Sequence, residues 1–330
     1  MVATMEAECL VCGLAVPPHG LRRTHLGEIM AFDCSNCGVA FTEASDHEGR
    51  LFEGAYIGKA KFSNSMDFYA RMNLYGRGLS PQSARRFLSF GHRLALAWFD
   101  NNLPRGATVL DVGCGMGLFL TLLADHGFSP VGYDIAPQPI QVLRDRGVAA
   151  FDGPTLVYPS DFATPQAVTI CQVLHHIARP VEFLARIRTQ IPNAPLLVIQ
   201  ARRDSWVHRL LRQPAFADPP RGMAYYSARA VSTALQRAGY RYVQIMSAGP
   251  HGVDLPYGPL HRRARDAYLQ YITWAERSRK GRGLTQLEHQ LFLRGAEALL
   301  VVKGFLSFPL VLYARARRWP GGNMVVIGFP

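Results

Sequence analysis

The sequence lacks the features typical of a secreted, repetitive or disordered chain. It has no low-complexity tract and no internal repeat, and 48% apolar with 18% charged residues is the composition of a folded globular protein. The first residues include Glu6 and Glu8 and hold no apolar run before a small-residue cleavage site, so we expect no signal peptide. The length of 330 residues suits about two domains in a cytoplasmic setting.

The C-terminal part has no hydrophobic run long enough to span a membrane. A helical insertion is expected at about 259–318, and its longest uncharged stretch, beginning at Gly304, covers 11 residues. A membrane-spanning helix needs about 20, so an ordinary transmembrane protein is excluded. Because the stretch runs directly into Arg315, Arg317, Arg318 and Trp319, residues 304–319 also suit a peripheral membrane contact, with a buried helix as the alternative.

Acidic residues are scarce at the C-terminal end. Residues 201–330 hold 20 Lys+Arg against 7 Asp+Glu, a net +13, whereas residues 1–60 carry −4 and the whole chain +12. A basic surface of this kind favours phosphate-bearing substrates, anionic lipid or nucleic acid, and the alternative is a solvated arginine-rich face.

Cysteines are few, and four of the six lie in two close pairs near the start of the chain. The pattern Cys9-x2-Cys12 and Cys34-x2-Cys37 is typical of four thiolates around one tetrahedral Zn²⁺. A site with four protein ligands has no open position, so we expect a structural zinc module over residues 1–45. Redox-active pairs are the alternative.

From residue 107 onward, strand-like and helix-like stretches alternate. This pattern predicts an α/β fold, a Rossmann-like, doubly wound, mostly parallel seven-stranded sheet covered by helices. We expect the domain to occupy residues 105–330, and helical spacing before it predicts a helical linker and lid over residues 46–104. Tyr56, Tyr69 and Tyr75 are candidates for a substrate wall in that linker.

A glycine-rich turn follows the first strand of the expected domain. The strand contains Asp111 and leads into Gly113, Cys114, Gly115 and Gly117. The three glycines allow the backbone a sharp turn and a close approach to a ligand. Leu118 stands where the dinucleotide fingerprint requires its third glycine. Asp134 ends the second strand, 21 residues beyond Gly113, where a carboxylate can accept both hydroxyls of a ribose.

Residues 107–200 resemble class I S-adenosylmethionine (SAM)-dependent methyltransferases. The resemblance implies that Asp111 to Gly117 hold the methionine end of SAM, that Asp134 holds its ribose and that Asp152 contacts the adenine amino group. The segment Gln172-Val-Leu-His-His also resembles the family, and it makes His175 and His176 the candidate bases for a hydroxyl acceptor.

The acceptor itself remains open between several hypotheses. The zinc-module segment resembles bacterial methyltransferases of glycans or small metabolites, which favours a small-molecule, sugar or lipid-linked acceptor. The basic C-terminal third favours an RNA methyltransferase instead, although the Asn/Asp-Pro-Pro-aromatic motif and an aromatic stacking stripe are missing. A SAM-binding scaffold without catalysis is the third hypothesis.

Overall fold

The computed structural model describes residues 6–24, 27–42, 89–211, 224–250 and 307–330. Its main sheet has seven strands in the order β12-β13-β10-β9-β6-β7-β8. They are β6 (Thr108–Val112), β7 (Ser129–Asp134), β8 (Ala150–Asp152), β9 (Ala167–Cys171), β10 (Leu196–Ala201), β12 (Tyr242–Ser247) and β13 (Asn323–Phe329). Only β13 is antiparallel to its neighbours β10 and β12, so the predicted mostly parallel sheet is confirmed.

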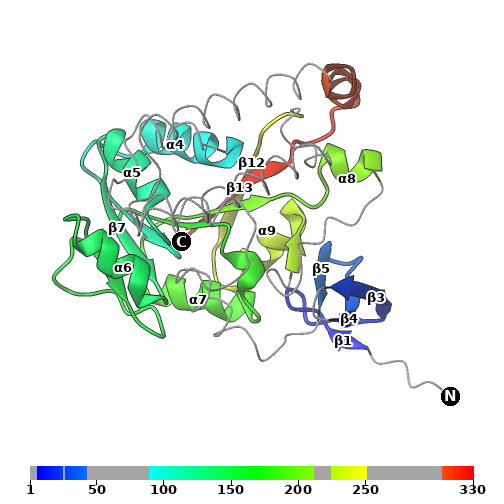
Figure 1. Ribbon diagram of the computed structural model, residues 1–330, viewed down its shortest axis with the longest axis horizontal. Coiled ribbons are helices and arrows are strands. Elements are labelled where there is room, and N and C mark those ends of the chain that lie inside the picture. The colour runs from blue at the N-terminus through cyan, green and yellow to red at the C-terminus, as the bar shows by residue number, and fades with distance from the viewer. Residues whose placement is uncertain (1–5, 25–26, 43–88, 212–223, 251–306) are drawn as a thin grey trace, which may run out of the picture.

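Helices cover both faces of this sheet (Figure 1). The helices and the sheet form two apolar clusters. Helices α4 and α5 pack against one face of the sheet, and α7 and α9 pack against the other. Helix α6 packs on β7 and β8 beside α5. The bounds are α4 (Phe90–Asn102), α5 (Leu118–Asp125), α6 (Pro137–Arg144), α7 (Pro180–Gln190), α8 (Trp206–Leu211) and α9 (Ala228–Arg237), with a 3-10 turn η1 (Leu174–His176) after β9.

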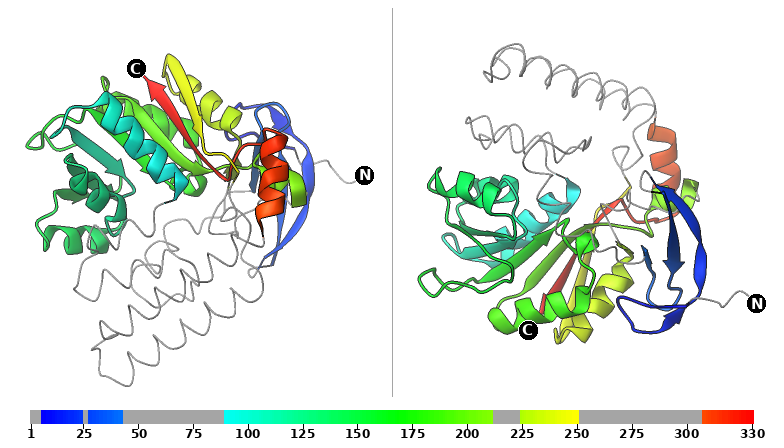
Figure 2. Two further views of the ribbon diagram at one scale, coloured as in Figure 1. Left: turned by 90° about the horizontal axis from the view of Figure 1, so that it is seen from above. Right: turned by 60° about the horizontal axis from the view of Figure 1, so that its bottom comes forward.

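The N-terminal module is built from short antiparallel strands. They are β1 (Ala7–Glu8) with β2 (Ala15–Val16), and β3 (Pro18–Thr24), β4 (Gly27–Asp33) and β5 (Val39–Thr42). A strand from far along the chain, β11 (Ala224–Tyr226), pairs with β5 and completes the second of these sheets. The module therefore docks against one end of the main domain, beside α8 and α9 (Figures 1 and 2).

A C-terminal helical segment stands beside α8. Residues 307–316 are helical and lie beside α8 in Figure 2. Val311 and Ala314 pack on Trp206. In the described ranges no helix has both the length and the apolar character needed to cross a membrane. The tyrosines proposed as a substrate wall, residues 46–88 of the linker and residues 259–306 of the insertion lie outside the described residues.

Candidate cofactor and metal sites

The glycine turn connects β6 to α5 in a conformation that few other residues adopt. Gly113, Gly115 and Gly117 have φ of +77°, +50° and +77°, in the left-handed region that favours glycine. A Cβ at Gly113 would also lie 2.4 Å from Val173 Cγ2. The turn thus packs directly against the segment that carries His175 and His176.

Asp134 joins this turn to the second strand. Its Oδ2 accepts a 2.9 Å hydrogen bond from the Gly115 N–H, and its Oδ1 accepts a 3.0 Å bond from the Ala136 N–H. The side chain is 6% exposed, and burial raises its pKa. Each oxygen retains acceptor capacity, so the carboxylate can receive ribose hydroxyls while it holds the turn.

Asp111 lies beneath the turn, on β6. It is 2% exposed, and its Oδ1 accepts a 2.7 Å hydrogen bond from the hydroxyl of Thr169 on β9. Burial raises its pKa to about 7, with a further contribution from the charge of Asp134, while the Thr169 hydrogen bond opposes the shift. A cationic ammonium nearby would favour the ionised form of this acid.

The remaining predicted acid occupies the end of the neighbouring strand. Asp152 on β8 is in register with Asp134 on β7. One of its oxygens forms a 3.0 Å ion pair with Arg144. Ile135 follows Asp134 and is 52% exposed, which places an apolar surface beside the two acids.

The start of α5 completes this edge of the sheet. Gly117 is its N-cap, no side chain caps the helix, and its first turn has no acidic residue. Backbone N–H groups and the positive end of the helix dipole suit an anionic group such as the methionine carboxylate. The residues present therefore fit SAM in both polar and apolar character.

The two histidines differ in their surroundings. The His175 Nδ1 lies 3.0 Å from the Nε2 of Gln200, a buried residue of β10, and the two rings of His175 and His176 have centroids 3.7 Å apart. Burial and the neighbouring His176 together lower the pKa of His175 to about 3, while the hydrogen bond with Gln200 opposes the shift. His175 is therefore neutral at ordinary pH and suited to hydrogen bonding more than to proton uptake.

The four N-terminal cysteines converge on one point. Their Sγ atoms all lie within 4.8 Å of one another, with Cys9 to Cys37 at 3.5 Å and Cys12 to Cys34 at 3.6 Å. Four sulfurs about 2.3 Å from a tetrahedral Zn²⁺ would be about 3.8 Å apart. The predicted cluster is confirmed, its geometry fits zinc, and none of the six cysteines forms a disulfide.

Several residues near the two candidate sites were not singled out by any sequence pattern. Gln200 lies near the end of β10, at the edge where parallel sheets bind ligands, so strand alternation could have indicated its position. The 3.0 Å contact between His92 Nε2 on α4 and Cys171 Sγ on β9 is a tertiary pairing that no local pattern indicates. Cys114 is buried and packs against α6.

Comparison with known proteins assigns the family of the main domain. Residues 82–245 match the family model described as a methyltransferase domain. The chain is 32% identical over 117 residues to the ribosomal protein L11 methyltransferase of Hahella chejuensis, over 34% of this chain and 35% of that protein. It is 28% identical over 120 residues to the ubiquinone biosynthesis O-methyltransferase of Thiobacillus denitrificans, over 33% of this chain and 50% of that protein.

A solved structure is also similar. It is a complex of the Haloferax volcanii Trm112 methyltransferase activator with a methyltransferase, 16% identical, covering 87% of this chain and 98% of that one, with a TM-score of 0.44. The chain spans no more than half the length of either curated relative named above. Through residues 82–245, the chain belongs to the SAM-dependent methyltransferases.

Proposed function

We propose that the protein transfers the methyl group of SAM to a small-molecule, sugar or lipid-linked acceptor. The observation that carries the proposal is the hydrogen bond from the Gly115 N–H to Asp134, because it joins the glycine turn and the ribose-binding acid into one pre-formed site. A site organised before the ligand arrives loses less entropy on binding.

Each part of SAM has a complementary group in this site. In the proposal, the methionine end lies on the turn of Gly113, Cys114, Gly115 and Gly117, above Asp111 and at the start of α5. Asp134 receives the ribose hydroxyls. The free acceptor capacity of Asp152 receives the adenine amino group beside Ile135.

The chain's own contribution to the reaction is alignment, water exclusion and proton removal. Bound SAM supplies an electrophilic methyl group, so the protein mainly has to orient the acceptor in line with it. For a hydroxyl acceptor, His176 takes the proton. His175 supports it as a neutral partner, oriented by Gln200.

Zinc has a structural role in this proposal. Cys9, Cys12, Cys34 and Cys37 would fill all four positions of the ion and leave none for a substrate. Bound Zn²⁺ would hold the two knuckles together in a module too small for a large apolar core.

We infer the acceptor class from the exposed side chains of the protein, because the names of the relatives do not indicate a single class. One relative is named for a ribosomal protein and the other for ubiquinone biosynthesis. On the C-terminal helical segment, Phe308, Leu310, Leu312 and Tyr313 are between 41% and 56% exposed. Arg315, Arg317 and Arg318 follow, so apolar and cationic side chains share one surface.

This surface, residues 307–319, suits an anionic lipid bilayer. Apolar side chains can enter the headgroup boundary while arginines contact lipid phosphates. We therefore extend the proposal to a peripheral membrane contact and a lipid-linked acceptor. The competing hypothesis is RNA methylation, which the positive net charge of the C-terminal third favours.

The direct test is transfer of label from methyl-labelled SAM to fractionated cell extract. We expect label in lipid or small-metabolite fractions, with mass spectrometry identifying the product. Label confined to RNA or to protein would overturn the acceptor class. Transfer to no fraction, with SAM bound, would favour the scaffold hypothesis. The matched control is the Asp134→Asn variant.

A further inference from the structure

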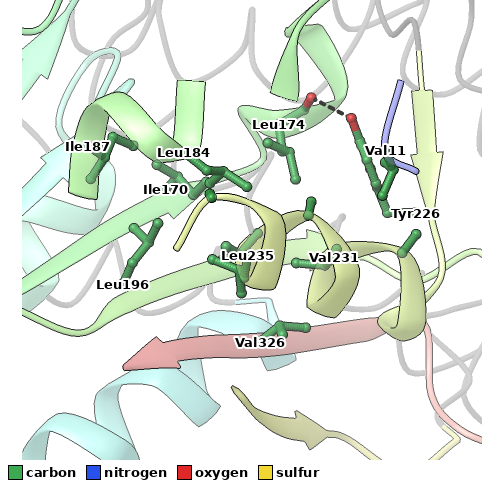
Figure 3. Close-up of a cluster of buried hydrophobic side chains, with 14 of the residues drawn as sticks. Val11, Ile170, Leu174, Leu184, Ile187, Leu196, Tyr226, Val231, Leu235 and Val326 are labelled. Atoms are coloured by element: carbon green, nitrogen blue, oxygen red, sulfur yellow. Dashed lines mark hydrogen bonds between the residues drawn. The ribbon is translucent and has the colours of Figure 1, made fainter. Parts of the chain in front are cut away.

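The buried hydroxyl of Tyr226 is bonded to the turn that carries the two histidines. Tyr226 is fully buried at the end of β11, and its hydroxyl donates a 3.2 Å hydrogen bond to the carbonyl oxygen of Leu174 (Figure 3). The same carbonyl accepts the Ile177 N–H at 3.2 Å, the bond that closes η1. Since His175 and His176 follow Leu174 directly, Tyr226 fixes the backbone from which both rings project.

The position of Tyr226 is set by the four-cysteine module. Strand β11 pairs antiparallel with β5, with Tyr226 opposite Val39, two residues after Cys37. The next residue, Ser227, donates from its hydroxyl to the Cys37 carbonyl at 3.2 Å and from its N–H to the Gly38 carbonyl at 3.3 Å. A Cβ at Gly38 would lie 2.5 Å from the Ser227 Oγ, so this contact is close.

Further polar contacts lock the module to the main domain around Tyr226. The Arg203 guanidinium pairs with Asp33 and donates to the Gly38 carbonyl at 3.3 Å, and its backbone N–H donates to the Tyr226 carbonyl at 3.0 Å. Arg237 on α9 donates to the Val11 carbonyl at 2.6 Å, beside the first knuckle. Val11, Tyr226 and Leu174 lie together in one apolar cluster (Figure 3).

A folding role alone would not require the module to contact the η1 turn. The side chains of Arg203 and Arg237 already anchor the module through contacts with Asp33, Gly38 and Val11, none of which belongs to η1. The Tyr226 hydroxyl instead ends on the one carbonyl that both closes η1 and precedes His175. In addition, Gln200 holds His175 from β10, so the pair is held from two directions.

We propose that Tyr226 is a positioning residue through which the four-cysteine module orients His175 and His176 toward the reacting methyl group. The inference rests on the proposed function for the role of the histidines, whereas the physical coupling from module to histidine turn is separately measurable. The module and η1 would then form one unit, in which a disturbance of the module acts first on the acceptor side of the site.

The test uses the full-length protein and the Tyr226→Phe variant, which keeps the ring packing and removes the hydroxyl. In ¹⁵N-histidine-labelled protein, we expect the ring signals of His175 and His176, assigned through His175→Gln and His176→Gln, to move. We expect SAM affinity by calorimetry to stay within about twofold. The transfer rate at saturating SAM should fall about fivefold, the effect of losing one buried hydrogen bond.

The control is Tyr158→Phe, which removes a more exposed tyrosine hydroxyl bond, of 2.7 Å to the Ala163 carbonyl, and should leave both histidine signals in place. A second variant, Arg237→Met, loosens the module at the Val11 carbonyl and should move the same signals. Unmoved signals in both Tyr226→Phe and Arg237→Met would overturn the inference. Moved signals with undiminished transfer would support the coupling and instead overturn the catalytic role of the histidines.

Discussion

The hydroxyl of Thr169 donates a 2.7 Å hydrogen bond to Asp111 between neighbouring strands of the main sheet. Asp111 and Thr169 are paired in register on β6 and β9, below the glycine turn, and Asp111 is almost completely buried. It partly offsets the burial that raises the pKa of Asp111. Because the raised pKa differs from that of the unfolded chain, the ionisation of Asp111 can be measured through the pH dependence of stability.

Asp111 should make stability depend on pH in a defined window. Its pKa rises from 3.8 to about 7 on folding, so between these values the folded protein holds a proton that the unfolded chain has lost. Its contribution to the free energy of unfolding is complete below pH 3.8 and is lost as pH rises toward 7. The loss amounts to no more than about 4 kcal/mol.

Urea unfolding of wild type and Asp111→Asn between pH 4.5 and 8 checks this prediction. The variant stays neutral, so the wild-type free energy should fall relative to it up to about pH 7 and run parallel above. The exposed Asp161→Asn variant should instead run parallel to wild type up to about pH 7. Parallel wild-type and Asp111→Asn curves over the whole range would contradict the prediction.

Asp134 and Asp152 should contribute unequally to SAM binding. Replacing Asp134 by Asn removes a charged acceptor for the ribose hydroxyls and disturbs the Gly115 N–H bond, so we expect roughly 10- to 100-fold weaker binding. Asp152 is more exposed and paired with Arg144, so Asp152→Asn should weaken binding by less than about fivefold.

Calorimetry with SAM and with its demethylated product measures both affinities, and thermal unfolding confirms that the variants are folded. An Asp134→Asn protein that binds SAM like wild type would remove the ribose assignment. A larger loss for Asp152→Asn than for Asp134→Asn would reverse the order of the two acids.

Local patterns predicted that Asp111, Gly113 and Asp134 come together at one edge of the sheet, but they did not indicate the tertiary pairings. Asp111, Gly113 and Asp134 lie at the ends of adjacent parallel strands, so strand alternation alone brings them together. The bond between Tyr226 and Leu174 joins residues 52 positions apart. The three-residue strand β11 that carries Tyr226 is too short for a periodic signal, and its partner β5 lies in another module.

The two histidines should differ in their effect on transfer. With a hydroxyl acceptor, His176→Gln removes the base and should lower the transfer rate roughly 10²- to 10⁴-fold. His175 is neutral and bonded to Gln200, so His175→Gln should cost about fivefold, the effect of one hydrogen bond. Rates measured at saturating SAM separate the two, and a greater loss for His175→Gln would exchange their roles.

The module should hold one Zn²⁺ per chain, measurable by metal analysis of the purified protein. Cys34→Ser removes one of four thiolates and should lower both zinc content and thermal stability, because metal binding and folding of such modules are coupled. Cys171→Ser, outside the cluster, should retain the ion. Iron or no metal in the wild-type protein would exclude the structural zinc assignment.

The surface of residues 307–319 should bind anionic bilayers. Phe308 and Leu312 are 56% and 47% exposed, and placing each in the headgroup boundary contributes about 1.5 kcal/mol, so changing both to Ser should weaken vesicle binding roughly 100-fold. Arg318→Ser should weaken vesicle binding about fivefold and reduce its salt dependence.

Co-sedimentation with phosphatidylglycerol-containing vesicles measures both effects, with phosphatidylcholine vesicles as the uncharged reference. Val157→Ser and Ile245→Ser, which remove exposed apolar side chains elsewhere, should bind like wild type. Equal binding to both vesicle types, or a wild-type dimer that dissociates on Leu312→Ser, would show that the surface has another partner.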